Sequence, residues 1–270
     1  MNVLLFFFSG TGITAKIAYD LADNFRTQNH SVTLHRLKYN NDLNDKYQIN
    51  EYDLIGIGAP TYSFRAPRLV TKILNKTDFK GKPFFLFCSS GGMPGNTIWN
   101  LFRCVQKSGG DFLGDFSFSG ITNLRSWMPL KTFPKSKSYG CTSPKYQVQK
   151  FSKKILEKLN EQNKIPVKKP IPNLINSIWS IFFTWRWQMA FTAGIKHVDK
   201  SKCTKCCLCA TKICSSRAIS LNSSKYPKFN EFRCVGCNGC LNLCPSDAIW
   251  AHSSKKHHQY DQYKEMILNN

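Results

Sequence analysis

The sequence predicts an α/β fold with a doubly wound, five-stranded parallel sheet, followed by a small α+β domain that is rich in cysteine. Two observations lead to this prediction. Over residues 1–160, short apolar runs alternate with segments of helical periodicity, which is typical of a parallel sheet covered on both faces. After residue 197, cysteines recur at short regular intervals, which indicates a second unit built around metal ligation.

The elements of the first domain follow from apolar patterning. The run from Asn2 to Phe8 predicts a buried first strand. A helix that begins near Thr14 is predicted because four apolar residues then recur at helical spacing: Ile13, Ile17, Leu21 and Phe25. The same reasoning predicts strands over 32–37, 53–58, 83–88 and 111–118, and helices from near 67, over 97–107 and over 145–160.

A glycine- and hydroxyl-rich loop joins the first strand to the first helix and reads Ser9-Gly10-Thr11-Gly12-Ile13-Thr14. Backbone N–H groups at a helix N-terminus form a ready anion site, and the hydroxyls add donors. The loop contains no lysine and does not match the phosphate loop of nucleotide hydrolases. It suits a phosphomonoester held by hydrogen bonds, and the alternative is an ordinary strand–helix turn.

Two further loops of this kind follow the third and fourth predicted strands. The first reads Ala59-Pro60-Thr61-Tyr62-Ser63, and the second runs from Ser89 to Asn96. In open parallel sheets, ligands bind at the carboxyl ends of strands, near the point where the strand order reverses. One loop for a phosphate and two loops to clasp a ring are the combination that a flavin site needs.

The cysteines near the carboxyl terminus form an internal repeat. The second half has the spacing C-x2-C-x2-C-x3-C-P, which is typical of cubane iron–sulfur ligation, and its cysteines are Cys234, Cys237, Cys240 and Cys244. Three cysteines lie 31 residues earlier in register, as 234 − 203, 237 − 206 and 240 − 209 show: Cys203, Cys206 and Cys209. The fourth, Cys214, lies one residue too late and precedes a serine, and we expect a local bulge to absorb the inserted residue.

The fourth cysteine of each run ligates the other cluster in two-cluster proteins. We therefore expect Cys244 to complete the set of Cys203, Cys206 and Cys209, and Cys214 to complete the set of Cys234, Cys237 and Cys240. Zinc is the competing interpretation, although zinc sites usually pair C-x2-C units at a distance. Cys207 is out of register and is expected to pack near a cluster without binding it.

Composition indicates which cellular compartment and which binding partners to expect. Twelve cysteines, of which eight have cluster spacing, favour a reducing compartment, and we expect a cytoplasmic protein. The formal charge of +22 favours an acidic redox partner protein. No nucleic-acid-reading motif is present, so we expect no nucleic-acid partner. The aromatic segment Asn173 to Phe191 is expected to be a helix that packs the two domains together, and binding to a membrane surface is the less favoured alternative.

Two parts of the chain resemble a known family. Leu5-Phe6-Phe7-Phe8-Ser9, followed by Gly12, Thr14, Ala18 and Leu21, is similar to the flavodoxin signature, and 53–62 resembles the flavodoxin loop after the third strand. Together with the cysteine repeat, residues 1–125 and 197–251 resemble the ferredoxin family that carries an amino-terminal flavodoxin-like domain. The resemblance implies FMN in the first domain and two [4Fe–4S] clusters in the second. Typical flavodoxins are acidic, and this basic chain differs from them.

The resemblance also assigns residues to the flavin. It implies that the phosphate is held by Ser9, Thr11, Gly12, Ile13 and Thr14. It places Pro60, Thr61, Tyr62 and Ser63 on one side of the ring, with Tyr62 as a candidate for stacking. It places Ser89, Ser90, Gly91, Gly92 and Asn96 on the other side. The alternatives are a surface aromatic for Tyr62 and helix capping for Ser89 and Ser90.

We therefore expect a flavodoxin-like domain over 1–164, a linker with an aromatic-rich connecting helix over 165–196, a two-cluster ferredoxin domain over 197–251 and a solvated tail over 252–270. No general base or nucleophile is evident, so an intracellular electron carrier is favoured over a substrate-specific enzyme. The alternatives are a two-cluster ferredoxin whose flavodoxin-like domain is a flavin-free docking scaffold, and a peripheral membrane-associated redox module.

Overall fold

The computed structural model describes residues 1–39, 43, 47–119, 144–160, 167–175, 177–178, 193–252 and 263–268. The first domain contains five strands: β1 (Asn2–Phe7), β2 (Ser31–Arg36), β3 (Leu54–Pro60), β4 (Pro83–Ser90) and β5 (Asp111–Ser119). Its helices are α1 (Ile13–Arg26), η1 (Ile49–Glu51), α3 (Arg68–Leu74), α4 (Thr97–Lys107) and α5 (Pro144–Asn160). These bounds lie close to the predicted ranges.

All five strands pair in parallel, in the order β2-β1-β3-β4-β5. The predicted five-stranded, doubly wound parallel sheet is therefore confirmed. Because β1 has β2 on one side and β3 on the other, the strand order reverses at β1, and this reversal opens a ligand position at the carboxyl ends of β1 and β3.

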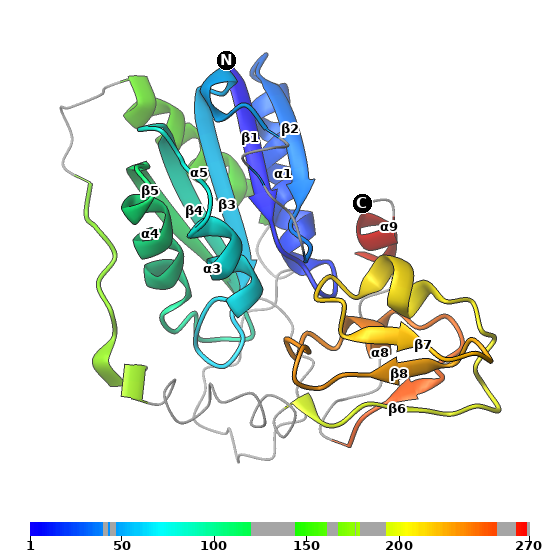
Figure 1. Ribbon diagram of the computed structural model, residues 1–270. Helices are drawn as coiled ribbons and strands as arrows, with labels where there is room; N and C mark the ends of the chain where they lie inside the picture. The colour runs from blue at the N-terminus through cyan, green and yellow to red at the C-terminus, as the bar shows by residue number, and fades with distance from the viewer. Residues whose placement is uncertain are drawn as a thin grey trace.

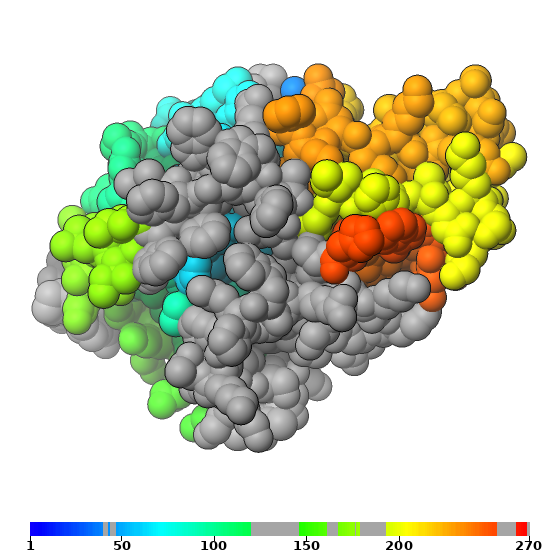
Figure 2. Space-filling view, turned by 90° about the horizontal axis from the view of Figure 1, so that it is seen from below, coloured from blue at the N-terminus to red at the C-terminus, as the bar shows by residue number. Residues whose placement is uncertain are grey.

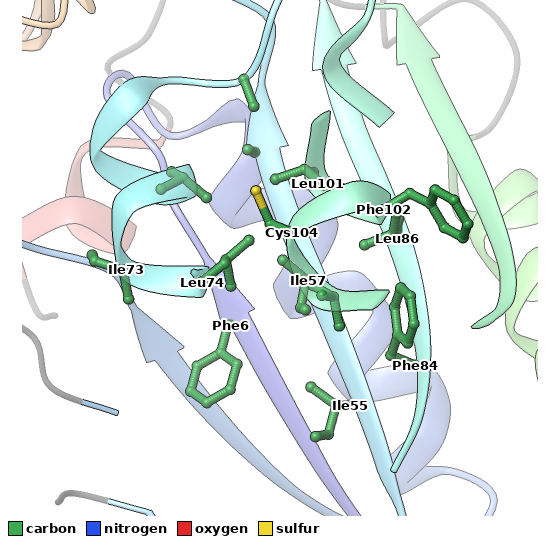
Figure 3. Packing of buried hydrophobic residues seen from close by; sticks show 14 of the residues in the cluster. Phe6, Ile55, Ile57, Ile73, Leu74, Phe84, Leu86, Leu101, Phe102 and Cys104 are labelled. Carbon is green, nitrogen blue, oxygen red and sulfur yellow. The ribbon is translucent and has the colours of Figure 1, made fainter. Parts of the chain in front are cut away.

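Two apolar layers enclose the sheet. Helices α1 and α5 cover one face, and α3 and α4 cover the other (Figure 1). In the layer beneath α3 and α4, side chains of three strands and both helices interdigitate, among them Phe6, Ile57 and Leu101 (Figure 3). On the opposite face, beneath α1 and α5, the packing is close enough to require glycine at Gly58, where an added Cβ atom would lie 2.1 Å from the ring of Phe87.

The cysteine-rich domain is built from short elements. Two antiparallel strand pairs, β6 (His197–Val198) with β9 (Ile249–Trp250) and β7 (Ile219–Leu221) with β8 (Pro227–Phe229), are joined by the π-helical turn η3 (Cys209–Ile213) and the helix α8 (Gly239–Asn242). The carboxyl ends of the sheet strands point toward this domain (Figure 1). Figure 2 looks at that end of the molecule and shows the small domain, in yellow to orange, on one side.

The carboxyl-terminal segment corrects one prediction. We expected a solvated tail over 252–270, yet Lys264–Leu268 forms helix α9, which packs on α1 and η3. Tyr263 is 7% exposed and Ile267 is 0% exposed, so this part of the tail belongs to the core. The prediction failed because the segment is too short for its apolar residues to show a helical period.

The connecting segment is described only in part. Residues 173–175 and 177–178 lie beside the loop after β4, whereas most of the predicted aromatic helix lies outside the described residues. In the part of the chain that the structure describes, no helix has both the length and the apolar character to cross a membrane.

Candidate cofactor sites

The loop after β1 forms an uncapped helix N-terminus. Gly12 has a φ of +105°, a left-handed conformation that favours glycine, and α1 begins directly after it without a side-chain cap. The N–H group of Gly12 donates to Ser9 Oγ at 3.1 Å. The first N–H groups of α1 have no intrahelical acceptor, and the hydroxyls of the loop stand beside them. This set of neutral donors fits a phosphate group.

The three predicted loops meet because β1, β3 and β4 are neighbours in the sheet. Thr14 Oγ1 lies 2.7 Å from Ser89 Oγ, which connects the first loop with the end of β4. The N–H group of Thr61 donates to the carbonyl of Ser89 at 2.8 Å, which connects the end of β4 with the loop after β3. Ser9 is buried as well, so hydroxyl groups form a polar centre at the carboxyl edge of the sheet. The predicted flavin residues are thus brought to one place.

The loop after β3 contains a strained turn. Tyr62 and Arg65 exchange two backbone hydrogen bonds, of 3.0 and 3.2 Å, around Ser63 and Phe64. Ser63 and Phe64 have φ values of 48° and 63°, in the left-handed region that non-glycine residues rarely adopt. Strain of this kind is often found at functional sites. The ring of Tyr62 lies edge-on to Phe8, and its stacking on a flavin stays a prediction.

The loop after β4 has a partner that the sequence did not reveal. Asn96 was predicted to line the flavin, but its side-chain oxygen accepts a hydrogen bond from the N–H of Asn173 at 2.8 Å. Its amide nitrogen donates to Ser177 Oγ at 2.9 Å and to the carbonyl of Asn173 at 3.2 Å. The amide therefore holds the connecting segment, and a contact with flavin would require these bonds to be replaced. Ser90 is buried at the end of β4, and Gly91 and Gly92 follow it.

The fold divides the eight repeat cysteines into two sets of four, in the predicted grouping. One cavity is lined by Cys203, Cys206, Cys209 and Cys244. A second cavity is lined by Cys214, Cys234, Cys237 and Cys240. Cys207 also borders the first cavity, where its Sγ lies 3.2 Å from the carbonyl of Lys205.

The inserted residue before Cys214 is absorbed by a change of helix type, so the predicted bulge is confirmed. Cys209–Ile213 forms a π-helical turn, closed by the hydrogen bond from Cys214 N to Cys209 O at 3.1 Å. In the other half, α8 makes an ordinary α-helical bond from Leu243 N to Gly239 O. A π turn spans one residue more than an α turn, and this extra residue returns Cys214 to the cavity wall.

The cysteines surround spaces and do not converge on a point. Among the described residues, no three His, Cys, Asp or Glu side chains come close enough together to hold a single metal ion. A tetrahedral zinc site requires such convergence, because its four ligands lie about 2.0–2.3 Å from the metal. The cysteine spacing C-x2-C-x2-C-x3-C-P is what favours a cubane cluster over zinc.

Burial makes the free thiols of the second set hard to ionise. It raises the pKa of Cys237 to about 12 and that of Cys240 well above its ordinary value. Thiolates at such positions need a cation, and the iron of a cluster would supply positive charge. Lys196 lies on the wall of the same cavity with its side chain 1% exposed. Burial opposes its charge, but Cys234, Glu231, Cys240 and Cys237 together outweigh burial and raise the pKa of Lys196.

The second cavity abuts the first loop of the flavodoxin-like sheet. A Cβ atom added to Gly10 would lie 2.5 Å from Cys237 Cβ and 2.8 Å from the Tyr62 hydroxyl. A Cβ atom added to Gly239 would lie 2.4 Å from the carbonyl oxygen of Gly10. On the other side of the loop, a Cβ atom on Gly12 would collide with Tyr263. The small domain and α9 thus enclose the outer side of the predicted phosphate loop.

Two family models match separate parts of the chain. Residues 4–104 match the family model described as a flavodoxin domain, and residues 227–250 match the model described as a 4Fe-4S binding domain. The chain therefore carries an amino-terminal flavodoxin domain and a carboxy-terminal 4Fe-4S binding domain. This pair of domains supports a role in electron transfer. No curated protein matches the chain.

Solved structures with similarity to the chain include several flavodoxins. A short-chain flavodoxin associated with a non-canonical PDU bacterial microcompartment is 15% identical, with a TM-score of 0.43, and the match covers 59% of this chain and 99% of that one. The flavodoxin of Streptococcus pneumonia TIGR4 is 16% identical, with a TM-score of 0.43 and coverage of 58% and 99%. A flavoprotein from Lactobacillus acidophilus, solved in complex with FMN, is 16% identical, with a TM-score of 0.35 and coverage of 43% and 92%.

Proposed function

We propose that this protein transfers electrons through two [4Fe–4S] clusters, coupled to FMN in the flavodoxin domain. The observation that supports the proposal best is the division of eight cysteines into two sets of four around separate cavities. Clusters of this type exchange single electrons, and FMN, when bound, supplies conversion between one- and two-electron steps. The close contact of Gly10 with Cys237 places the second set directly beside the predicted phosphate loop.

The protein's own residues have distinct parts in this proposal. The hydroxyls of Ser9, Thr11 and Thr14 and the N–H groups at the start of α1 would hold the phosphate of FMN. The cysteines would hold the clusters, and Ile219, Leu241 and Ile249 form the apolar cluster around them. Low polarity around a cluster excludes water and helps to set its reduction potential.

Quantifying iron, sulfide, zinc and flavin in one anaerobically purified sample tests this proposal. We expect about eight iron and eight sulfide per chain from two cubane clusters, and about one FMN. Stoichiometric zinc without iron would contradict cluster binding, and about four iron per chain would contradict the second cluster.

FMN binding needs a separate test, because the residues proposed to hold FMN differ from those proposed to hold the clusters. Replacing Ser9→Ala together with Thr14→Ala removes two hydroxyl donors, and we expect bound FMN to fall while iron stays unchanged. The matched control is Thr27→Ala with Ser31→Ala, two exposed hydroxyl residues of the same domain. Equal FMN content in both double variants would refute the assigned phosphate site.

A second candidate is a two-cluster ferredoxin whose flavodoxin domain binds no flavin and serves as a docking scaffold. The Asn96 amide favours this candidate, since the connecting segment already satisfies it. Full iron content without FMN, after anaerobic reconstitution with excess FMN, would be the expected result for the scaffold.

We further propose that the redox partner is an acidic protein. The formal charge of +22 supports this, because such a field accelerates association with negatively charged surfaces. The rate of electron transfer to an acidic ferredoxin should then fall steeply as ionic strength rises, and a rate that is independent of salt would contradict the idea.

A further inference from the structure

A cleft of about 500 Å³ lies between the two domains, outside the predicted phosphate loop. One wall is formed by the turn after β3 and the start of α3, with Tyr62, Arg65 and Arg68. The other wall is formed by the segment that leads to Cys234. In Figure 1, these walls are the cyan loop below β3 and the orange loop that faces it. A cleft of this volume is in the range of sites for small molecules.

Among the described residues, the charges on the walls all have the same sign. Arg65, Arg68 and Lys72 line the side of the flavodoxin domain, and Arg233 lines the opposite side. None of the described residues that line the cleft is an aspartate or glutamate. Within the described ranges, none of these four cations forms a salt bridge. Burial and the neighbouring Arg68 lower the pKa of Arg65, and a bound anion would relieve this repulsion.

Rings are the second feature of the cleft. Tyr39, Tyr62 and Phe232 line it from three different segments, and Phe232 is 68% exposed. Exposed aromatic rings beside guanidinium groups can stack on a flat molecule while the guanidinium groups pair with its charge. Cys234, a predicted ligand of the second cluster, lines the same cleft.

From these features, we propose that the cleft binds a small organic anion that carries a planar ring, next to the cluster held by Cys234. Four cations recognise the charge, and Tyr39 and Phe232 recognise the ring, because Tyr62 is already assigned to the flavin. The inference rests on the proposed function only for the cluster at Cys234. Recognition of the ring and the charge does not need FMN. An acidic protein segment is a poorer occupant, because the site is a cavity between domains and its size suits a single small molecule.

The experiment is a calorimetric titration of cluster-loaded protein with three probes at low salt. The probes are 2-naphthoate, which has ring and charge, 2-naphthol, which has the ring, and acetate, which has the charge. We expect saturable binding of 2-naphthoate and at least roughly tenfold weaker binding of the other two. We also expect 2-naphthoate to change the electron paramagnetic resonance spectrum of the reduced protein, because the cleft borders a cluster ligand.

Charge-matched variants locate the site. Arg68→Gln with Arg233→Gln removes one cation from each wall and should weaken 2-naphthoate binding by roughly tenfold or more. The control, Lys150→Gln with Lys168→Gln, removes two exposed cations that do not line the cleft and should change binding by less than about twofold. Iron and FMN contents, measured on each variant, separate loss of this site from loss of the cofactors.

Several results would overturn the proposal. Equal weakening in both double variants would show a general charge effect. Acetate that binds as tightly as 2-naphthoate would show an anion site without ring recognition. Absence of 2-naphthoate binding at millimolar concentration would also refute it. If poly-glutamate bound in a manner sensitive to Arg68 and Arg233 while 2-naphthoate did not, the cleft would be a docking site for an acidic protein and not for a small molecule.

Discussion

Replacing Arg36 with methionine removes four hydrogen bonds that join the sheet to the carboxy-terminal part of the chain. Arg36 is the last residue of β2 and is 2% exposed. Its guanidinium donates to the carbonyls of Ile267 at 2.8 Å, Ile213 at 3.1 Å and Lys212 at 3.3 Å, and to Ser215 Oγ at 2.8 Å. One side chain therefore holds β2, the start of the cluster domain and α9 together.

The expected loss of stability in Arg36→Met follows from these hydrogen bonds. A hydrogen bond from a charged group contributes roughly 1.5–3 kcal/mol, and a buried carbonyl without a donor costs about 1–3 kcal/mol. The four terms are not additive, and methionine avoids the cost of burying a charge. We therefore expect the free energy of unfolding to fall by about 1–3 kcal/mol, because buried neutral acceptors lose their donor while the cost of burying a charge is relieved. Lysine cannot replace the planar guanidinium, so Arg36→Lys should also destabilise the protein.

The assay is anaerobic urea unfolding followed by circular dichroism for the whole chain and by cluster absorption for the small domain. In the original protein we expect the two signals to change together. In Arg36→Met, cluster absorption should be lost at a lower urea concentration, because the small domain loses its support. Arg26→Met is the control, since this exposed arginine pairs with Asp23 and donates to the carbonyl of Val32 at the surface, and its loss should cost less than about 1 kcal/mol.

A result would refute the reasoning if Arg36→Met unfolded within about 1 kcal/mol of the original protein, with both signals still coincident. The two domains would then be held together by apolar contact and by backbone bonds such as that from Tyr39 N–H to the carbonyl of Ser215 at 2.7 Å, and the buried guanidinium would contribute little beyond the cost of its own burial.

Three further predictions concern the clusters and the contacts between the domains. Cys214→Ser should lower the iron content from about eight toward four per chain, whereas Cys207→Ser should leave it unchanged, as anaerobic iron analysis would show. Gly10→Ala places a methyl group against Cys237 of the cluster domain and should destabilise the protein by about 1–3 kcal/mol in urea unfolding; an unchanged midpoint would mean that the contact can relax. Ile267→Ala should cost about 2–5 kcal/mol and the exposed control Glu265→Ala less than about 0.5 kcal/mol, and equal effects would contradict the packing of α9.

The parts of the structure that could be predicted from sequence depend on neighbours along the chain. The run 2–8 is continuously apolar because β1 is buried on both faces, and four apolar residues at helical spacing defined α1. The cysteine spacing is local as well, because three cysteines at intervals of three residues must line one small volume. The expected bulge before Cys214 followed from one extra residue, and the π turn bears it out.

Other features depend on residues that are far apart in the sequence. In the sequence, Arg36 is an ordinary basic residue of an alternating strand. One acceptor of its hydrogen bonds, the carbonyl of Ile267, lies 231 positions later in the chain. The Asn96 amide was assigned to the flavin because nothing local revealed its bonds to Asn173. Lys196 and Glu231 form another such pair, 3.6 Å apart beside the second cavity. Single residues that meet across domains leave no period or motif in the chain.

The kinds of element, the parallel sheet and the two cysteine runs could be predicted from the chain alone, because hydrophobic periodicity and ligand spacing act within a few residues. The contact of the second cysteine set with Gly10, the cover of Tyr263 over Gly12 and the cleft lined by cations of both domains became evident in the folded protein. Docking of the two domains depends on surface shape and on satisfying buried polar groups, and both are properties of the folded surfaces and not of local sequence.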